Sequence, residues 1–156
     1  MKSILQPSPV YQVAEISITY SSGTGSFERP KITSSWQAHD VFLETWEKGT
    51  IGHREQLRVL LLNRSNTVLG VYLASSGGIA GTVCDPKLVF QVALKANASS
   101  IILAHNHPSG NLTPSEADRK LTKKLVEAGK LLDLPVCDHL ILTEEGYLSM
   151  ADEGLM

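Results

Sequence analysis

The sequence predicts one globular domain of the mixed α/β or α+β class. Stretches with helical spacing of apolar residues alternate with short apolar runs typical of buried strands, and two of these runs follow one another directly. The chain has 156 residues, of which 42% are hydrophobic and 19% are charged. This length and composition suit a single domain with its own hydrophobic core.

The first part of the chain predicts one strand and one helix. Loose alternation over residues 11–19 is typical of a strand, and the Gly- and Ser-rich stretch at 21–30 is typical of a loop. Ser35 is suited to cap a helix that runs through Trp46, and Gly49 is suited to end it.

The middle of the chain predicts a hairpin and a second helix. Residues 55–62 carry a run of Leu and Val typical of a buried strand, and residues 68–74 form another strand after a turn of polar residues. Such a pair predicts an antiparallel hairpin. Asp85 is a good N-cap with Pro86 at the first helical position, so a helix should run from there to about Ala96.

The last part predicts a strand, a helix and a final strand. The buried strand at 100–104 leads into the polar stretch 105–110, whose composition is typical of a loop. Thr113, with a Glu three residues later, has the spacing of a capping box and predicts the start of a helix with one apolar face. Residues 136–142 are expected to form the last core strand.

Charge and cysteine content narrow the choice of partners and compartment. The net charge of -2 argues against nucleic acid as the main partner, although a local basic patch stays open. Cys84 and Cys137 lack the spacing of metal ligands or of a disulfide framework, so free thiols in a reducing cytoplasm are expected. The first ten residues have no signal-peptide pattern, and no stretch approaches the roughly 18 apolar residues of a membrane span.

Two histidines and an aspartate form the chemically informative pattern. His105 and His107 follow a predicted buried strand, and if the strand continues through them both rings point to the same side. Asp118 comes 11 residues after His107, in the first part of the predicted helix. Two imidazoles and one carboxylate are the ligand set of an open catalytic zinc site, in which water takes the fourth position.

Each of these residues also has a simpler interpretation. Two histidines beside a loop are commonly surface residues, and Asp118 or Ser115 alone suits a residue at the start of a helix. His139 lies on a predicted strand, where it suits a core or edge histidine or a group that orients a ligand. Only the combination of residues favours a metal site.

The same residues resemble a known family. His-Asn-His-Pro, with Ser115 and Asp118 eight and eleven residues after His107, is similar to the JAMM motif of the JAB1/MPN metalloprotease superfamily. The longer run HNHPSGNLTPSEAD resembles its RadC-like branch, and the resemblance extends from about Ser34 to Met156. Residues 1–33 are then an N-terminal strand and loop extension. Further similar segments are LLLNR at 60–64, SSGG at 75–78, DH at 138–139 and GYLS at 146–149.

The resemblance implies a fold, a cofactor and residue roles. The fold is a cytidine-deaminase-like MPN arrangement, a curved mixed sheet flanked by helices. The bound cofactor is Zn²⁺, held by His105, His107 and Asp118. An upstream Glu at the start of the first core strand acts as general base, which by position is Glu55. Ser115 matches the motif serine, which helps to hold the water or to polarise the scissile carbonyl.

Three functions stay open at this point. The first is a zinc-dependent peptidase or isopeptidase with an unidentified peptide or protein substrate. The alternative is a DNA-repair or mobile-element accessory protein of the RadC type with a structural metal. Many RadC proteins carry an N-terminal helix-hairpin-helix region, whereas residues 1–30 here have the pattern of a strand and a loop. A noncatalytic scaffold is a third option, and a homodimer is compatible with all three.

Overall fold

The computed structural model describes residues 14, 16–17, 19, 21, 28–77 and 84–156. The strand expected at residues 11–19 and most of the expected N-terminal extension lie outside these residues. Among the residues described, none of the helices has the length and hydrophobicity that crossing a bilayer requires. Cys84 and Cys137 are both free thiols, the first buried and the second exposed.

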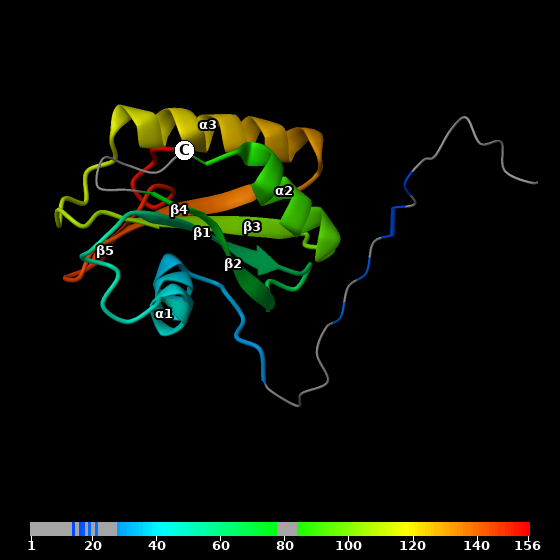
Figure 1. Cartoon of the computed structure of the whole chain (residues 1–156), viewed down its shortest axis with the longest axis horizontal. Coiled ribbons are helices and arrows are strands. Elements are labelled where there is room, and N and C mark those ends of the chain that lie inside the picture. The colour runs from blue at the N-terminus through cyan, green and yellow to red at the C-terminus, as the bar shows by residue number, and fades with distance from the viewer. Residues whose placement is uncertain (1–13, 15, 18, 20, 22–27, 78–83) are drawn as a thin grey trace, which may run out of the picture.

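A five-stranded mixed sheet organises the described part of the chain (Figure 1), which confirms the predicted fold class. The strand order is β2-β1-β3-β4-β5, and every neighbouring pair is antiparallel except β3 and β4. The strands are β1 (Gln56–Leu62), β2 (Val68–Ser76), β3 (Ser100–Asn106), β4 (Val136–Leu142) and β5 (Tyr147–Ser149).

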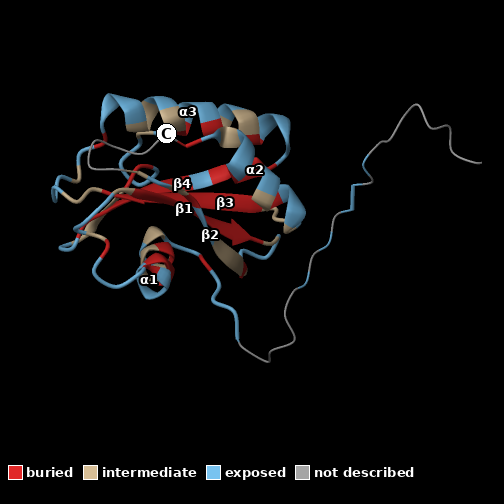
Figure 2. Ribbon diagram, viewed as in Figure 1, coloured by how far each residue is buried: buried red, intermediate tan, exposed pale blue. Residues whose placement is uncertain are grey.

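Helices cover both faces of the sheet, as Figure 1 shows. Helix α1 (Ser35–Thr45) packs on one face, and α2 (Pro86–Lys95) and α3 (Glu116–Leu131) pack on the other. The central strands β1 and β3 are buried along their whole length (Figure 2), which explains why their sequences are nearly continuous apolar runs.

Strand β3 alternates between two cores. Ile101 and Leu103 belong to the core beneath α2 and α3, whereas Ile102 and Ala104 belong to the core beneath α1. Because side chains alternate along a strand, the next odd-numbered residue, His105, faces α3. One face of β3 therefore carries both the apolar side chains of the core beneath α2 and α3 and the polar side chain of His105.

Helix starts differ from the sequence prediction in two places. Helix α1 is capped by Ser34, whose hydroxyl accepts from the Gln37 N–H, and not by Ser35. Helix α3 is capped by Ser115 in a capping box with Asp118, so the box expected at Thr113 is wrong. The helix begins two residues later because Ser115 has the extended backbone of a cap, with φ of -70° and ψ of 166°. This shift places Asp118 in the first turn.

Candidate metal centre

His105 and His107 lie at the end of β3. His105 is part of the strand and is only 3% exposed. His107 follows the strand, and its N–H donates to the carbonyl of Leu142 on β4 at 2.9 Å, so the extended chain continues beside β4. The two Nε2 atoms are 2.8 Å apart. The expected strand end at residue 104 is thus two residues too early, and the longer strand brings both rings to the same side.

Asp118 reaches the two rings from the first turn of α3. Its Oδ1 is 3.2 Å from His105 Nε2, and its Oδ2 is 3.4 Å from His107 Nε2. The Ser115 N–H donates to Asp118 Oδ2 at 2.7 Å, and Ser115 Oγ accepts from the Asp118 N–H at 3.1 Å. The same carboxylate therefore closes the capping box and faces both imidazoles.

The three side chains form a group that could hold a metal ion. One ligand atom from each of His105, His107 and Asp118 lies within 4.8 Å of the others. Two imidazole nitrogens and one carboxylate oxygen directed at one point form a donor set of the kind that zinc accepts in open sites. The residues present therefore fit a divalent metal with nitrogen and oxygen ligands.

The charges of this group stabilise one another. Burial opposes ionisation of Asp118, but hydrogen bonds from His105, His107 and Ser115 outweigh it and hold the pKa of Asp118 well below its usual range. The hydrogen bond to Asp118 raises the pKa of His107 against the effect of burial, and the Asn111 carbonyl and the charges of Asp118 and Glu55 raise it further. The Glu55 carboxylate is thus close enough to act electrostatically on this ring.

Glu55 is half-buried and immediately precedes β1. In the antiparallel pairing of β1 and β3, Leu57 lies opposite His105, so continuing the register by two residues places Glu55 level with His107. The Glu55 carbonyl accepts from the Gly77 N–H at 2.9 Å, just beyond the end of β2. The position expected for a general base therefore lies at the same end of the sheet as the histidines.

Asn106 anchors the loop that carries Glu55, and sequence reasoning missed this role. The residue is completely buried. Its Oδ1 accepts from the Gln56 N–H at 2.7 Å, and its Nδ2 donates to the carbonyls of Ile51 and Arg54 at 2.6 and 2.9 Å. The composition of residues 105–110 suggested only a loop. The usable signal was the alternation of the strand, which turns Asn106 away from the face of the two histidines.

His139 lies behind His105. It is completely buried on β4, and its Nε2 is 2.7 Å from His105 Nδ1. Its Nδ1 is 2.6 Å from the Thr122 hydroxyl, which donates to the Asp118 carbonyl at 2.7 Å. Burial lowers the pKa of His139 well below the ordinary value, which suits a neutral ring with one N–H and one lone pair.

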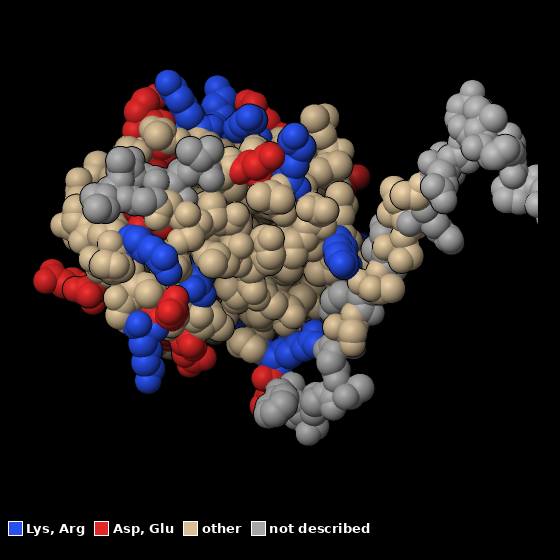
Figure 3. Space-filling view, viewed as in Figure 1, with Lys and Arg blue, Asp and Glu red and all other residues tan. Residues whose placement is uncertain are grey.

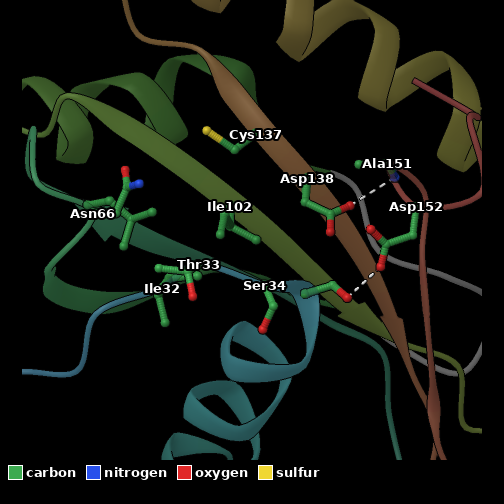
Figure 4. A pocket seen from close by; sticks show the side chains of 11 residues that line it. Ile32, Thr33, Ser34, Asn66, Ile102, Cys137, Asp138, Ala151 and Asp152 are labelled. Carbon is green, nitrogen blue, oxygen red and sulfur yellow. Dashed lines mark hydrogen bonds between the residues drawn. The ribbon is translucent and has the colours of Figure 1, made fainter.

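A pocket of about 270 Å³ lies on the opposite face of the sheet, beside the start of α1 (Figure 4). Asp138, the neighbour of His139, lines this pocket, as does Ile102 of the α1 core. The Asp138 carboxylate accepts from the His139 and Ala151 N–H groups at 2.7 and 3.0 Å and from the Ser149 hydroxyl at 2.6 Å. Asp138 therefore connects β4 to the chain beyond β5 and stands apart from the histidine cluster.

Comparisons with known proteins match most of the chain to one family. A family model described as RadC-like JAB domain matches residues 32–155. A UPF0758 protein of Flavobacterium johnsoniae is 48% identical over 125 residues, which cover 80% of this chain and 53% of that protein. A UPF0758 protein of Porphyromonas gingivalis is 45% identical over 104 residues, covering 66% and 46% of the two chains. The chain spans about half the length of these curated relatives.

Proposed function

Because the chain belongs to the RadC-like JAB domain family, we propose that it is a zinc-dependent hydrolase that cleaves an amide bond, as a peptidase or an isopeptidase. The observation that carries the proposal is the convergence of His105, His107 and Asp118 on one point at the end of β3. The nearby carboxylate of Glu55 adds a group suited to proton transfer.

His105, His107 and Asp118 would hold the metal. A bound zinc ion supplies Lewis acidity, which polarises a carbonyl oxygen and makes water a better nucleophile at neutral pH. The capping box supports this role because it fixes the Asp118 side chain before any ligand arrives. Pre-organised donors need no reordering on binding, which favours tight capture of the ion.

Glu55 is the proposed general base. Its carboxylate accepts the proton of the attacking water and returns it to the leaving amine nitrogen. Asn106 supports this assignment, because its three hydrogen bonds fix the chain on both sides of the carboxylate-bearing residue. A proton acceptor on a fixed loop can stay within hydrogen-bond reach of the attacking water and then of the leaving nitrogen.

Ser115 is proposed to contact the substrate carbonyl. Its Oγ accepts a hydrogen bond from the Asp118 N–H, and the hydroxyl proton can still be donated to an oxygen that becomes negative. The start of α3 adds a favourable dipole at the same place. Both effects stabilise developing negative charge, as an oxyanion site requires.

The alternative of a DNA accessory protein has weaker support. The chain has a net charge of -2. Acidic and basic side chains are interspersed on the face shown in Figure 3, including the surface over α3. Phosphate binding depends on concentrated positive charge.

Metal content is the first test. Purified wild-type protein should carry near-stoichiometric zinc by plasma mass spectrometry, and His107→Ala, prepared identically, should lose it. His53→Ala is the matched control because His53 is exposed and outside the donor group, so this variant should keep the metal. Wild-type protein that neither carries zinc nor takes it up from solution would contradict the proposed zinc-dependent function.

Activity of the zinc-loaded protein is the second test. Panels of peptides and isopeptide-linked peptides are screened, and Glu55→Gln should lower turnover by about 10²- to 10⁴-fold while zinc content stays unchanged. Glu44→Gln is the control, since Glu44 is an exposed residue of α1. Wild-type turnover in Glu55→Gln would remove Glu55 from the mechanism.

A further inference from the structure

We propose that His139 is a positioning residue that fixes the orientation and tautomer of His105. Thr122, which is hydrogen-bonded to the Asp118 backbone carbonyl, holds His139 in turn. The three side chains form one hydrogen-bonded chain from the Asp118 backbone carbonyl to His105. The inference rests on the proposed function only in treating His105 as a metal ligand. The function of His139 is then to leave the correct nitrogen of His105 available.

The direction of each hydrogen bond follows from the carbonyl at the end of this chain. The Asp118 carbonyl can only accept, so the Thr122 hydroxyl donates to it, at 2.7 Å. Thr122 Oγ1 must then accept from His139 Nδ1–H, at 2.6 Å. The other acceptor near Thr122, Met150 Sδ, is more distant at 3.7 Å and is a weak one.

The proton positions on both rings are set as a result. With its proton on Nδ1, the neutral His139 ring has a lone pair on Nε2, which accepts from His105 Nδ1–H at 2.7 Å. In its neutral form the His105 ring therefore carries its lone pair on Nε2, on the side of His107 and Asp118. If these hydrogen bonds ran in the opposite direction, the neutral His105 ring would carry its proton on Nε2. That is the atom that faces His107 and Asp118.

Because these three side chains are buried, water cannot easily replace the hydrogen bonds between them. His139 is completely buried, and Thr122 and His105 are 2% and 3% exposed. Water has no easy access to the His105 Nδ1–H, so loss of the His139 acceptor leaves a buried donor unsatisfied. The ring of His105 is then free to rotate or to change tautomer, and either change removes Nε2 from the donor group.

The fold brings these residues together from three elements. Leu103 of β3 lies opposite His139 in the parallel pairing, so His139 shares the sheet face of His105. Thr122 is one turn after Asp118 on α3. The hydrogen-bonded chain therefore holds β3, β4 and α3 in the relative positions that the donor group needs.

The test compares three variants by their affinity for zinc, measured by competition with a chromophoric chelator. His139→Leu removes the acceptor and keeps the apolar volume, and it should weaken zinc binding by about 10- to 100-fold. His139→Gln offers an amide oxygen to His105 and should bind zinc more tightly than the leucine variant. Asp138→Asn alters a buried, hydrogen-bonded neighbour on the opposite sheet face and should keep wild-type zinc affinity.

A second measurement needs no substitution and no metal. Nitrogen-15 spectra of the histidine rings in metal-free wild-type protein should show a proton on Nδ1 of both His105 and His139, and a bare Nε2 on His139. A proton on His139 Nε2 would overturn the proposal. Wild-type zinc affinity in a folded His139→Leu, judged by circular dichroism, would overturn it as well.

The outcomes separate this inference from the proposed function. Absence of zinc binding by wild-type protein would defeat the proposed function, while the ring spectra would still decide the tautomers. Normal zinc binding by the wild type with equal affinities in His139→Leu and Asp138→Asn would defeat the role of His139 alone.

Discussion

Asp118 shows how one side chain serves local structure and chemistry together. Its carboxylate accepts the Ser115 N–H in the capping box and also faces His105 and His107. A carboxylate in the first turn is favoured by the helix dipole in any case, so the fold stabilises the charge that a cation needs. The N-terminus of α3 and the candidate site therefore cannot be altered independently at this residue.

The capping arrangement gives a prediction at the scale of single residues. Ser115→Ala should lower the free energy of unfolding of the metal-free protein by about 0.5–2 kcal/mol, because the Asp118 N–H loses its acceptor. Thr113→Ala should change it by less than about 0.5 kcal/mol, because Thr113 does not cap the helix. Urea unfolding monitored by circular dichroism measures both values. Equal losses in the two variants would show that the cap is assigned to the wrong residue.

The roles of some residues of the candidate site could be predicted from the sequence, and the roles of others could not. The pattern of His105, His107 and Asp118 could be recognised because it follows a motif with fixed spacing. The role of Asn106 could not, and for His139 the orienting role was one of several interpretations, since both roles depend on contacts with residues 50 and 34 positions away in the chain. A buried polar side chain has no periodicity of its own, so only the three-dimensional arrangement identifies its partner.

At the scale of whole elements, the sequence predicted the strands and helices of the described region well. The apolar runs of β1, β3 and β4 are long enough to have one interpretation, and Asp85 with Pro86 gave the correct start of α2. The short strand β5 was not predicted, and the other errors fell at element ends. Strand β3 runs into the polar stretch because pairing with β1 and β4 continues beyond the last apolar residue. Tertiary pairing there outweighs the local preference for a loop.

The connection from α3 to β4 depends on close packing at one glycine. A Cβ built on Gly129 would clash with the carbonyl oxygen of Leu134. The Leu134 N–H donates to the Gly129 carbonyl at 2.8 Å, so the two backbones cannot separate without losing this bond. The chain leaving α3 turns against the helix at this point and starts the strand that carries His139.

Gly129→Ala should therefore destabilise the protein, although alanine normally stabilises a helix interior relative to glycine. The expected loss is about 1–3 kcal/mol in the free energy of unfolding, because the backbone of the connection must shift. Gly146→Ala is the control, since nothing lies within 4 Å of a Cβ at that position. Urea unfolding that shows a gain in stability for Gly129→Ala would mean that the connection moves easily.

At the scale of the whole molecule, the donor group brings together side chains from two different elements of the fold. His105 belongs to β3 in the middle of the sheet, whereas Asp118 belongs to α3, which covers one face. The apolar core beneath α3 holds these elements together through residues such as Leu125 and Leu103. A bound metal would add a second connection between the sheet and the helix, at the end of β3.

Removal of the metal should therefore lower the stability of the whole domain. A ligand that binds only the folded state adds about 2.7 kcal/mol when its concentration is 100 times the dissociation constant. For a chain of this size each kcal/mol changes the melting temperature by about 2–4 °C, so a chelator should lower it by roughly 5–10 °C. The measurement is a thermal scan of zinc-loaded protein with and without chelator.

His107→Ala should show no such change in melting temperature, because one of its three donors is missing. An equal change in that variant would mean that the chelator acts elsewhere, whereas a change confined to the wild type would tie the stability of the domain to the point where β3 and α3 meet.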